Sequence, residues 1–280
     1  MNKRGENYQF EMSSPITAEK SCSRLSTHLT YGTISHRAVF QEATKKRDQI
    51  KHTNKNFAKS INSFLSRLHW RSHFIQKLED QPSIEHTSFI PVYDQIREKD
   101  EEKLEAWIKG KTGVHFIDAC MIYLRNYGWI NFRMRAMLAS FASYNLWLDW
   151  RYFAPRLAAL FTDFEPGIHY SQIQMQSGTT GINTIRMYNP YKQAMDQDPL
   201  AKFIKSQIPE VKNFPPAFFH NPPKKSLNVN LFDNEFQKEI INVKETAQYA
   251  RKKIFDIRKS QEHKILAKNV YLKHGSRGRS

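Results

Sequence analysis

The chain has 280 residues, and its 43 Lys and Arg against 27 Asp and Glu give a formal net charge of +16. So strong a positive charge indicates nucleic acid as the partner, with an anionic membrane surface as the alternative. No stretch approaches the roughly 20 apolar residues of a spanning helix, and no signal-peptide core follows Met1. We therefore expect no membrane partner and a cytoplasmic protein.

The two cysteines, Cys22 and Cys120, are too few for a disulfide framework and indicate a reducing compartment. They are also too few for an iron–sulfur cluster, which needs four thiolates. His69 and His73 have the i, i+4 spacing of metal ligands, but no third ligand accompanies them, so we predict no metal site.

Residues 1–20 are polar and predict an extended lead-in. In the following "SCSRLST", the hydroxyl residues Ser23 and Ser26 flank Arg24 and could hydrogen-bond a pyrophosphate, with Leu25 turned inward. A plain helix cap is the alternative interpretation of these serines.

Residues 35–80 predict two helices, the second with a regular apolar stripe. A glycine break at 110–113 precedes another helix with an ordinary apolar core face. Trp107 and Trp129 are expected to lie in the core.

The best-determined helix covers residues 130–148, where apolar side chains recur at i, i+3, i+4 and i+7. Arg133 and Arg135 lie among them, and a guanidinium held against a core needs an anionic partner. Asp163 and Glu165 are the nearest carboxylates downstream, although two acids there could also form a generic helix cap.

The polar run over residues 167–180 has no amphipathic period and predicts an irregular loop. Such a loop between firm helices is either a place where a ligand is gripped or a solvated surface. After Pro190 a proline-containing segment leads to a charged helical region at 231–272, and the last thirty residues, from Arg251 to Arg279, form a basic end dense in Lys and Arg. This end is either a solvated tail or an arm that follows phosphates.

Several ordered stretches resemble the flavin-binding helical domain of the DNA photolyase and cryptochrome family. They are "CSRLSTHLTYGTIS", "GKTGVHFIDACMIYLRNYGW", "FRMRAMLASF", "LWLDWR", "SGTTGINT" and "FIKSQIPEV". The resemblance implies an all-α fold, a helical bundle of the photolyase type that binds FAD. We divide the chain into a lead-in at 1–20, the FAD-binding domain at 21–230 and a basic helical C-terminal segment at 231–280.

The same resemblance implies roles for individual residues around the cofactor. Arg135 and Asp163 match the family's ion pair beside the flavin ring, Glu165 a second acid near it, and His169 the residue that faces flavin N5. Because histidine titrates near neutral pH, we expect the flavin photochemistry to depend on pH. The remaining residues expected at the cofactor are Tyr8, Cys22, Ser23, Arg24, Leu25, Ser26 and Arg71.

On the DNA side, Trp70 matches the tryptophan on which an extrahelical base stacks. The chain departs from the family at Arg67, where photolyases place a glutamate that bonds the lesion, and at Met175, which replaces a tryptophan of the base cavity. Trp150 matches the middle of three electron-transfer tryptophans, but the other two positions fall on Ile173 and near Arg97. The usual electron route is therefore interrupted. Trp147 or Tyr170 could replace it, or a cellular reductant could act directly on the flavin.

These features predict a photolyase-type lyase that splits cyclobutane pyrimidine dimers by electron transfer from excited, reduced FAD. A cryptochrome-like photosensor, or a flavin-bearing nucleic-acid-binding protein without repair activity, is the alternative. The chain begins almost where the flavin domain of relatives begins, so no antenna domain is expected in it. We expect a monomer that prefers single-stranded DNA.

Overall fold

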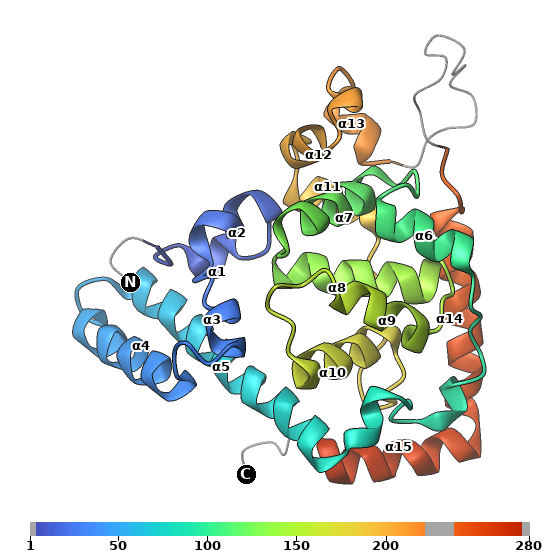
Figure 1. The fold of residues 1–280 in the computed structure, drawn as a ribbon, viewed down its shortest axis with the longest axis horizontal. Helices are drawn as coiled ribbons and strands as arrows, with labels where there is room; N and C mark the ends of the chain where they lie inside the picture. Colours follow the sequence, from blue (N-terminus) through green and yellow to red (C-terminus); the bar gives the residue numbers. More distant parts are fainter. Residues whose placement is uncertain (1–3, 222–237, 276–280) are drawn as a thin grey trace.

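The computed structural model describes residues 4–221 and 238–275, and these ranges fold into helices joined by short loops (Figure 1). The predicted all-α class is confirmed. Within the described ranges there is no strand, and the single β-bridge joins Glu98 to Leu148. No helix in this part of the chain is long and apolar enough to cross a bilayer.

The α-helices follow one another along the chain from Tyr8 to His274. They are α1 (Tyr8–Glu11), α2 (Pro15–Ser21), α3 (Ser26–Thr30), α4 (His36–Ile50), α5 (Lys55–Asp80), α6 (Glu101–Lys109), α7 (His115–Tyr127), α8 (Phe132–Ser140), α9 (Trp150–Ala158), α10 (Pro166–Ser177), α11 (Pro190–Gln197), α12 (Lys202–Gln207), α13 (Pro216–Phe219), α14 (Val243–Lys259) and α15 (Gln261–His274). The 3-10 turns are η1 (Pro82–Glu85), η2 (Pro91–Tyr93) and η4 (Pro209–Val211), and η3 (Phe141–Asn145) is a π-helical turn.

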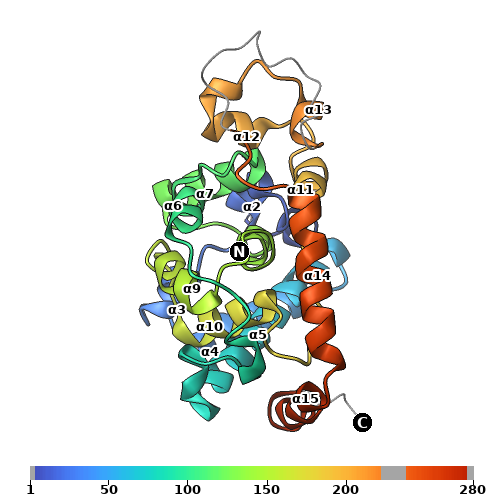
Figure 2. The ribbon, with the colours of Figure 1, turned by 90° about the vertical axis from the view of Figure 1, so that its right-hand side faces the viewer.

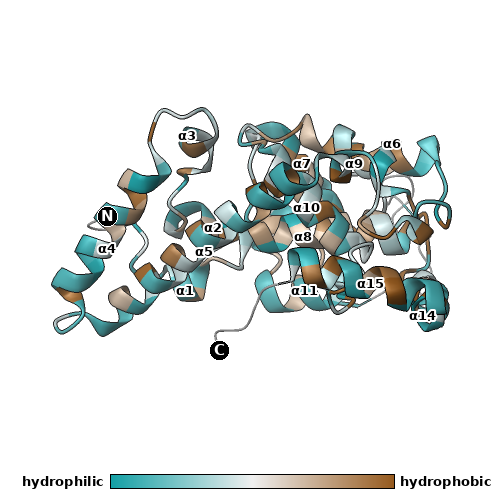
Figure 3. Cartoon of the chain, turned by 90° about the horizontal axis from the view of Figure 1, so that it is seen from below, coloured by the Kyte–Doolittle hydropathy of each residue, from teal (hydrophilic) through white to brown (hydrophobic). Residues whose placement is uncertain are grey.

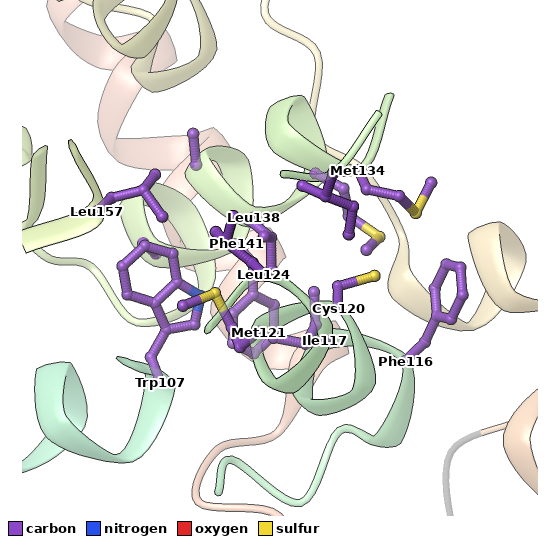
Figure 4. Packing of buried hydrophobic residues seen from close by; sticks show 14 of the residues in the cluster. Trp107, Phe116, Ile117, Cys120, Met121, Leu124, Met134, Leu138, Phe141 and Leu157 are labelled. Carbon is purple, nitrogen blue, oxygen red and sulfur yellow. The ribbon is translucent and has the colours of Figure 1, made fainter. Parts of the chain in front are cut away.

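The main core forms where α7 and α8 pack together with α6 and α9 around them. Figure 4 shows Met121 and Leu124 of α7 facing Leu138 and Phe141 across this contact, with Trp107 beside them. Trp107 and Trp129 are both buried, as predicted. Large aromatic side chains such as Trp107, Phe141 and Phe153 fill the space between these helices, together with aliphatic and methionine side chains.

Two predicted stretches differ from the structure near the start and the middle of the chain. Residues 1–20 were expected to be extended, but α1 and α2 form there, because Pro15 occupies the first turn of α2 and Ser14 accepts a hydrogen bond from the N–H of Ile16. The helix expected over 130–148 ends as α8 at Ser140 and continues as the π-helical turn η3.

The polar run at 167–180 was wrongly expected to be an irregular loop, because α10 occupies most of it. This helix is buried on nearly all sides, so it shows no amphipathic period. Its polar side chains bond to other backbones: Gln174 donates to the carbonyls of Ile84 and Thr87 and accepts from the N–H of Phe89. From the sequence alone, such buried and hydrogen-bonded polar residues cannot be distinguished from the polar residues of a solvent-exposed segment.

Helices α4 and α5 form an antiparallel hairpin with a small core of its own, at the blue end of the ribbon in Figure 1. The 26-residue α5 extends beyond this hairpin and lies beside α10. The two helices approach closely at Gly167, where a Cβ atom would lie 2.7 Å from the Cα of Ile75. A glycine is therefore required for α5 and α10 to pack at this distance.

The C-terminal helices α14 and α15 cover a second apolar cluster on the opposite side of the molecule from the α4–α5 hairpin (Figures 1 and 2). Their buried side chains, Ala250, Ile254 and Val270, pack with Ile90 and Tyr144. Seen from below in Figure 3, the hairpin projects from the larger body that contains α7 to α10. The predicted division of the chain at residue 230 falls outside the described residues.

We predict that Gly167→Ala destabilises the protein by about 1–3 kcal/mol, because the added methyl group overlaps the backbone of α5. An ordinary helix-interior Gly→Ala change would stabilise by up to about 1 kcal/mol. Urea denaturation measures the difference. Since the clash involves the Cα of Ile75, adding Ile75→Ala should give no rescue, and a rescue would place the clash on the side chain instead.

Candidate functional site

An ion pair between Arg135 and Asp163 lies at the centre of the predicted site. The guanidinium makes two parallel bonds to the carboxylate, Nη1 to Oδ1 at 3.0 Å and Nη2 to Oδ2 at 2.9 Å, while Nε donates to the carbonyl of Ile130. The Asp163 side chain is only 3% exposed. Burial alone would raise its pKa, but the charge and hydrogen bonds of Arg135, with a hydrogen bond from Ser26, hold the pKa below its usual value.

A second ion pair joins α5 to the same segment, two residues further on. Arg71 Nη2 lies 3.0 Å from Glu165 Oε2, and both side chains are about four-fifths buried. Glu165 occupies the N-cap position of α10, but its side chain makes no capping hydrogen bond. The two acids are thus partners of arginines from α8 and α5, and the structure does not support the helix-cap alternative.

Helix α3 connects these two ion pairs. Thr30 Oγ1 lies 3.4 Å from the carbonyl oxygen of Asp163, and the carbonyl of Leu29 accepts a hydrogen bond from Arg71. Together with the bond from Ser26, these contacts bring the "SRLS" segment next to both acids. Sequence reasoning missed Leu29 and Thr30, because a backbone carbonyl and a threonine hydroxyl carry no distinctive pattern.

The Ser23–Ser26 segment has a strained backbone and a stacked arginine. Arg24 adopts φ 59°, and its Cζ lies 4.0 Å from the centroid of the Trp129 ring. Trp129 therefore supports Arg24 from the core side, a cation–π role that was not predicted for it. Leu25, which was expected to turn inward, is half-buried and packs with the α4–α5 core.

Tyr8 and Cys22 lie at the other end of this segment. Burial raises the pKa of Tyr8 to about 12, an effect that Cys22 adds to and Arg67 opposes, and it raises the pKa of the Cys22 thiol to about 11. Tyr8 and Ser23 also line a cavity of about 50 Å³, together with Arg4, Gly5, Ser21, Phe57, Ser60, Ile61 and Phe64. The structure thus places Tyr8 and Ser23 at one cavity, with Cys22 close to Tyr8.

His169 differs from its predicted behaviour. It is buried on α10, and its Nε2 donates to the carbonyl of Ala154 at 2.9 Å. Burial lowers its pKa to about 4, against a smaller raising effect of that hydrogen bond, so the imidazole is neutral at physiological pH. The expectation that it titrates near pH 7 is therefore wrong.

Trp70 lies on the exposed side of α5, one turn after Arg67 and next to Arg71. Its side chain is 44% exposed, and it stacks on Phe74 with 5.7 Å between ring centroids and an interplanar angle of 26°. An indole supported from one side and open on the other is suited to stack against a base. Met175 is half-buried on α10, the helix that packs against α5.

The Trp150 region has an aromatic neighbour that spacing could not reveal. Trp150 is buried, donates to Ser88 Oγ at 2.9 Å, and lies 6.4 Å from the ring of Tyr170. Tyr170 in turn lies 5.2 Å from the His169 ring. The aromatic contacts of Trp150 therefore continue toward the ion-paired centre, although Ile173 occupies the nearby position that the resemblance assigns to a tryptophan.

The residues present fit a dinucleotide ligand. The cavity at Tyr8 and Ser23 provides hydroxyl groups and Arg4 as donors for phosphates, and the two ion pairs next to helix α3 provide fixed charges. On α8 and α10, buried Arg133 Nε and Gln172 Oε1 have no hydrogen-bond partner among the residues that the structure describes. His69 packs against Phe40, and no group of three His, Cys, Asp or Glu side chains converges in residues 4–221 and 238–275.

We predict that Arg135→Ala and Asp163→Ala each destabilise the protein by roughly 3–5 kcal/mol, because either change leaves one buried charge without its partner. The double change Arg135→Met with Asp163→Leu should recover most of that loss. Urea denaturation of the three variants tests this. If the double variant is as unstable as the sum of the single variants, the pair does not act as a unit.

We predict that stability falls between pH 6.5 and about 4, partly because unfolded His169 takes up a proton that the folded protein excludes. His169→Asn should reduce this pH dependence, because asparagine takes up no proton in either state. Chemical denaturation at several pH values provides the measurement. A pH slope of equal size in the variant would assign the effect to other buried histidines, such as His115 and His274.

The chain is similar to known photolyases and to a cryptochrome. A deoxyribodipyrimidine photo-lyase of Buchnera aphidicola is 32% identical over 241 residues, which cover 84% of this chain and 48% of the relative. An archaeal photolyase from Sulfolobus tokodaii, solved with two FAD molecules, has a TM-score of 0.72 at 29% identity over 88% of this chain and 52% of its own. A Synechocystis cryptochrome shares the fold, with a TM-score of 0.80 at 22% identity over 90% of this chain and 52% of its own.

The chain spans about half the length of the curated relatives it matches. The family described as the FAD binding domain of DNA photolyase matches residues 64–263, which is more than half of the chain. That range contains both ion pairs, Trp70, Trp150 and His169. The chain therefore belongs to the DNA photolyase family and carries its FAD-binding helical domain.

Proposed function

We propose that the protein repairs cyclobutane pyrimidine dimers in DNA in a light-driven, FAD-dependent reaction, preferentially in single strands. The observation that supports this best is the position of exposed Trp70 beside Arg71, whose guanidinium is paired with Glu165 at the cofactor site. A base stacked on Trp70 would thus lie next to the residues that hold the cofactor. The high positive charge fits a DNA substrate.

The chain's own residues bind, orient and exclude water. Ser23, Arg24 and Ser26 would hold the phosphates of FAD, while Asp163 and Arg135 would fix a charge beside the flavin ring. Reduced FAD, when bound and excited by light, supplies the electron that opens the cyclobutane ring and then takes it back. Neutral His169 holds its Nε2 proton on Ala154, so it does not exchange protons near pH 7.

Trp70 would hold the damaged bases after they leave the stack. Extruding a base costs a few kcal/mol, and less when it is damaged or unpaired. A flat aromatic ring with one exposed face recovers part of that cost by stacking, without requiring a particular base. This is the basis for the proposed preference for single strands.

We also propose that electrons reach this site through Tyr170 and Trp150. Their rings are 6.4 Å apart and both are buried, and Tyr170 also adjoins His169. Trp147, the other candidate, lies under Arg97, with the guanidinium carbon 4.9 Å from its ring centroid. A positive charge so near opposes the loss of an electron from that indole.

The alternative function is a photosensor or a flavin-bearing nucleic-acid binder without repair activity. Arg67 favours it, because a cation one turn from Trp70 replaces the acid that the resemblance assigns to lesion bonding. Ile173 and Met175 favour it as well, since both replace tryptophans.

We predict light-dependent loss of the dimer when the FAD-loaded, chemically reduced protein is mixed with a single-stranded oligonucleotide that contains one thymine dimer. Near-ultraviolet or blue illumination, a dark control and chromatography of the oligonucleotide give the measurement. Trp70→Ala should weaken binding of the damaged strand by about 5- to 150-fold, the value of one stacked base. Exposed Tyr127 on α7 supplies the control Tyr127→Ala, which should change neither binding nor repair.

The same assay with a duplex substrate tests the strand preference. Equal or faster repair of the duplex would contradict it. No dimer loss in either substrate, despite measurable binding and bound reduced FAD, would favour the photosensor or binder.

A further inference from the structure

The C-terminal helices α14 and α15 carry many exposed positive charges. In the part of the chain that the structure describes, the ion pairs involve residues between Arg47 and Asp196, and none uses a side chain of α14 or α15. The exposed cations of these two helices are Lys244, Arg251, Lys252, Lys253, Lys259, Lys264, Lys268 and Lys273. Their exposed acids are Glu245, Asp256 and Glu262.

On α14 the exposed cations lie outside the buried stripe, with the exposed acids Glu245 and Asp256 among them. Buried Val243, Ala250 and Ile254 mark the inner side of the helix. The helical spacing of 100° per residue places Arg251, Lys252 and Lys259 on the other sides, together with Lys244 and Phe255. Figure 2 shows α14 running along one side of the molecule with this face uncovered by any other labelled helix.

Exposed aromatic rings lie between these cations. Tyr249 is 50% exposed, with Lys253 Nζ 5.6 Å from its ring centroid, and Phe255 is 55% exposed, with Lys259 Nζ at 4.6 Å. Alternating aromatic rings and cations are the elements with which proteins bind single-stranded nucleic acid without sequence preference.

The C-terminal end of α15 packs against the end of α5, the helix that carries Trp70. His274, at the end of α15, is hydrogen-bonded to Gln81 just after α5, and its ring lies 5.1 Å from Phe89. Lys77 Nζ lies 5.9 Å from the ring of Phe89 and 5.6 Å from that of Phe74, on which Trp70 stacks. A strand that leaves Trp70 toward the C-terminal end of α5 would therefore reach α15 next.

We propose that the outward faces of α14 and α15 bind the backbone of the single strand that flanks the base held by Trp70. The position of that base rests on the proposed function, whereas binding by α14 does not. The lysines and Arg251 contact phosphates, and Phe255 and Tyr249 stack on bases. This surface binds undamaged nucleic acid and sets the affinity, while Trp70 distinguishes damaged from undamaged strands.

The test compares two triple variants with equal loss of charge. Arg251→Gln, Lys252→Gln and Lys259→Gln remove exposed cations from α14. The matched control, Lys103→Gln, Lys109→Gln and Lys192→Gln, removes three lysines that are ion-paired to Asp100, Glu105 and Asp196. Fluorescence anisotropy with an undamaged single-stranded 20-mer is measured over a range of salt concentrations, and thermal denaturation checks that all variants are folded.

We expect the α14 variant to reduce the slope of log K against log salt by about 2, since each phosphate contact contributes about 0.7. At 0.1 M salt this smaller slope corresponds to a binding affinity roughly 100-fold weaker than that of the unaltered protein. The affinity of the control variant stays within about threefold of that of the unaltered protein. Phe255→Ala should weaken binding at least about fivefold and leave the slope unchanged. Equal slopes for the two triple variants, or no loss of affinity, would overturn the proposal.

Two further measurements distinguish a nucleic-acid surface on α14 from a membrane surface and from the base site at Trp70. Vesicles containing anionic phosphatidylserine test a membrane as partner, and charge-dependent vesicle binding without a matching effect on DNA would overturn the proposal. Trp70→Ala should keep the salt slope of the undamaged strand. If the unaltered protein shows this salt slope but repairs no dimer, the proposed function fails and the α14 surface stands.

Discussion

The structure depends on one constraint, which is that the carboxylate of Asp163 is buried and must be neutralised there. A bare carboxylate out of water costs several kcal/mol, and Arg135 removes that cost with two bonds and a position 4.3 Å over the Phe161 ring. Glu165, two residues later, is likewise neutralised by an ion pair with Arg71 of α5. A segment of three residues thus fixes α8, α5 and, through Ser26 and Thr30, α3 around one point. The predicted cofactor residues converge because these charges leave few other arrangements.

The paired charges of the site and the unpaired charges of α14 and α15 have different roles. Inside, Arg135 and Arg71 are paired with carboxylates, so their geometry is fixed before any ligand arrives and little is reorganised on binding. Outside, the cations of α14 and α15 form no ion pair within residues 4–221 and 238–275, so they remain available to phosphates. Such surface groups contribute to the net charge of +16. The composition alone could not have shown where in the fold the excess positive charge lies.

The sequence predicted those features that rest on periodicity or on charge balance. The apolar positions of α7 and the need of Arg135 for a carboxylate could be recognised because each follows from local spacing or from one strong energy. The buried α10 could not, since Gln174 and Ser171 satisfy their hydrogen bonds on partners about 80 to 100 residues away in the chain. The same reason hid the neutral state of His169, whose pKa depends on burial and on the carbonyl of Ala154. In each case a polar residue was expected to face water or a ligand, and the tertiary structure supplied the partner instead.

Arg97 shows how a substitution in the electron route is accommodated. Its guanidinium is buried, donates to the carbonyls of Ser143 and Ser177 at 3.0 and 2.7 Å, and lies over the ring of Trp147. A fixed cation 4.9 Å from an indole makes its radical cation harder to form, and the low local dielectric strengthens this effect. The cation of Arg97 therefore disfavours a radical cation on Trp147, which agrees with the route through Tyr170 and Trp150 that we propose.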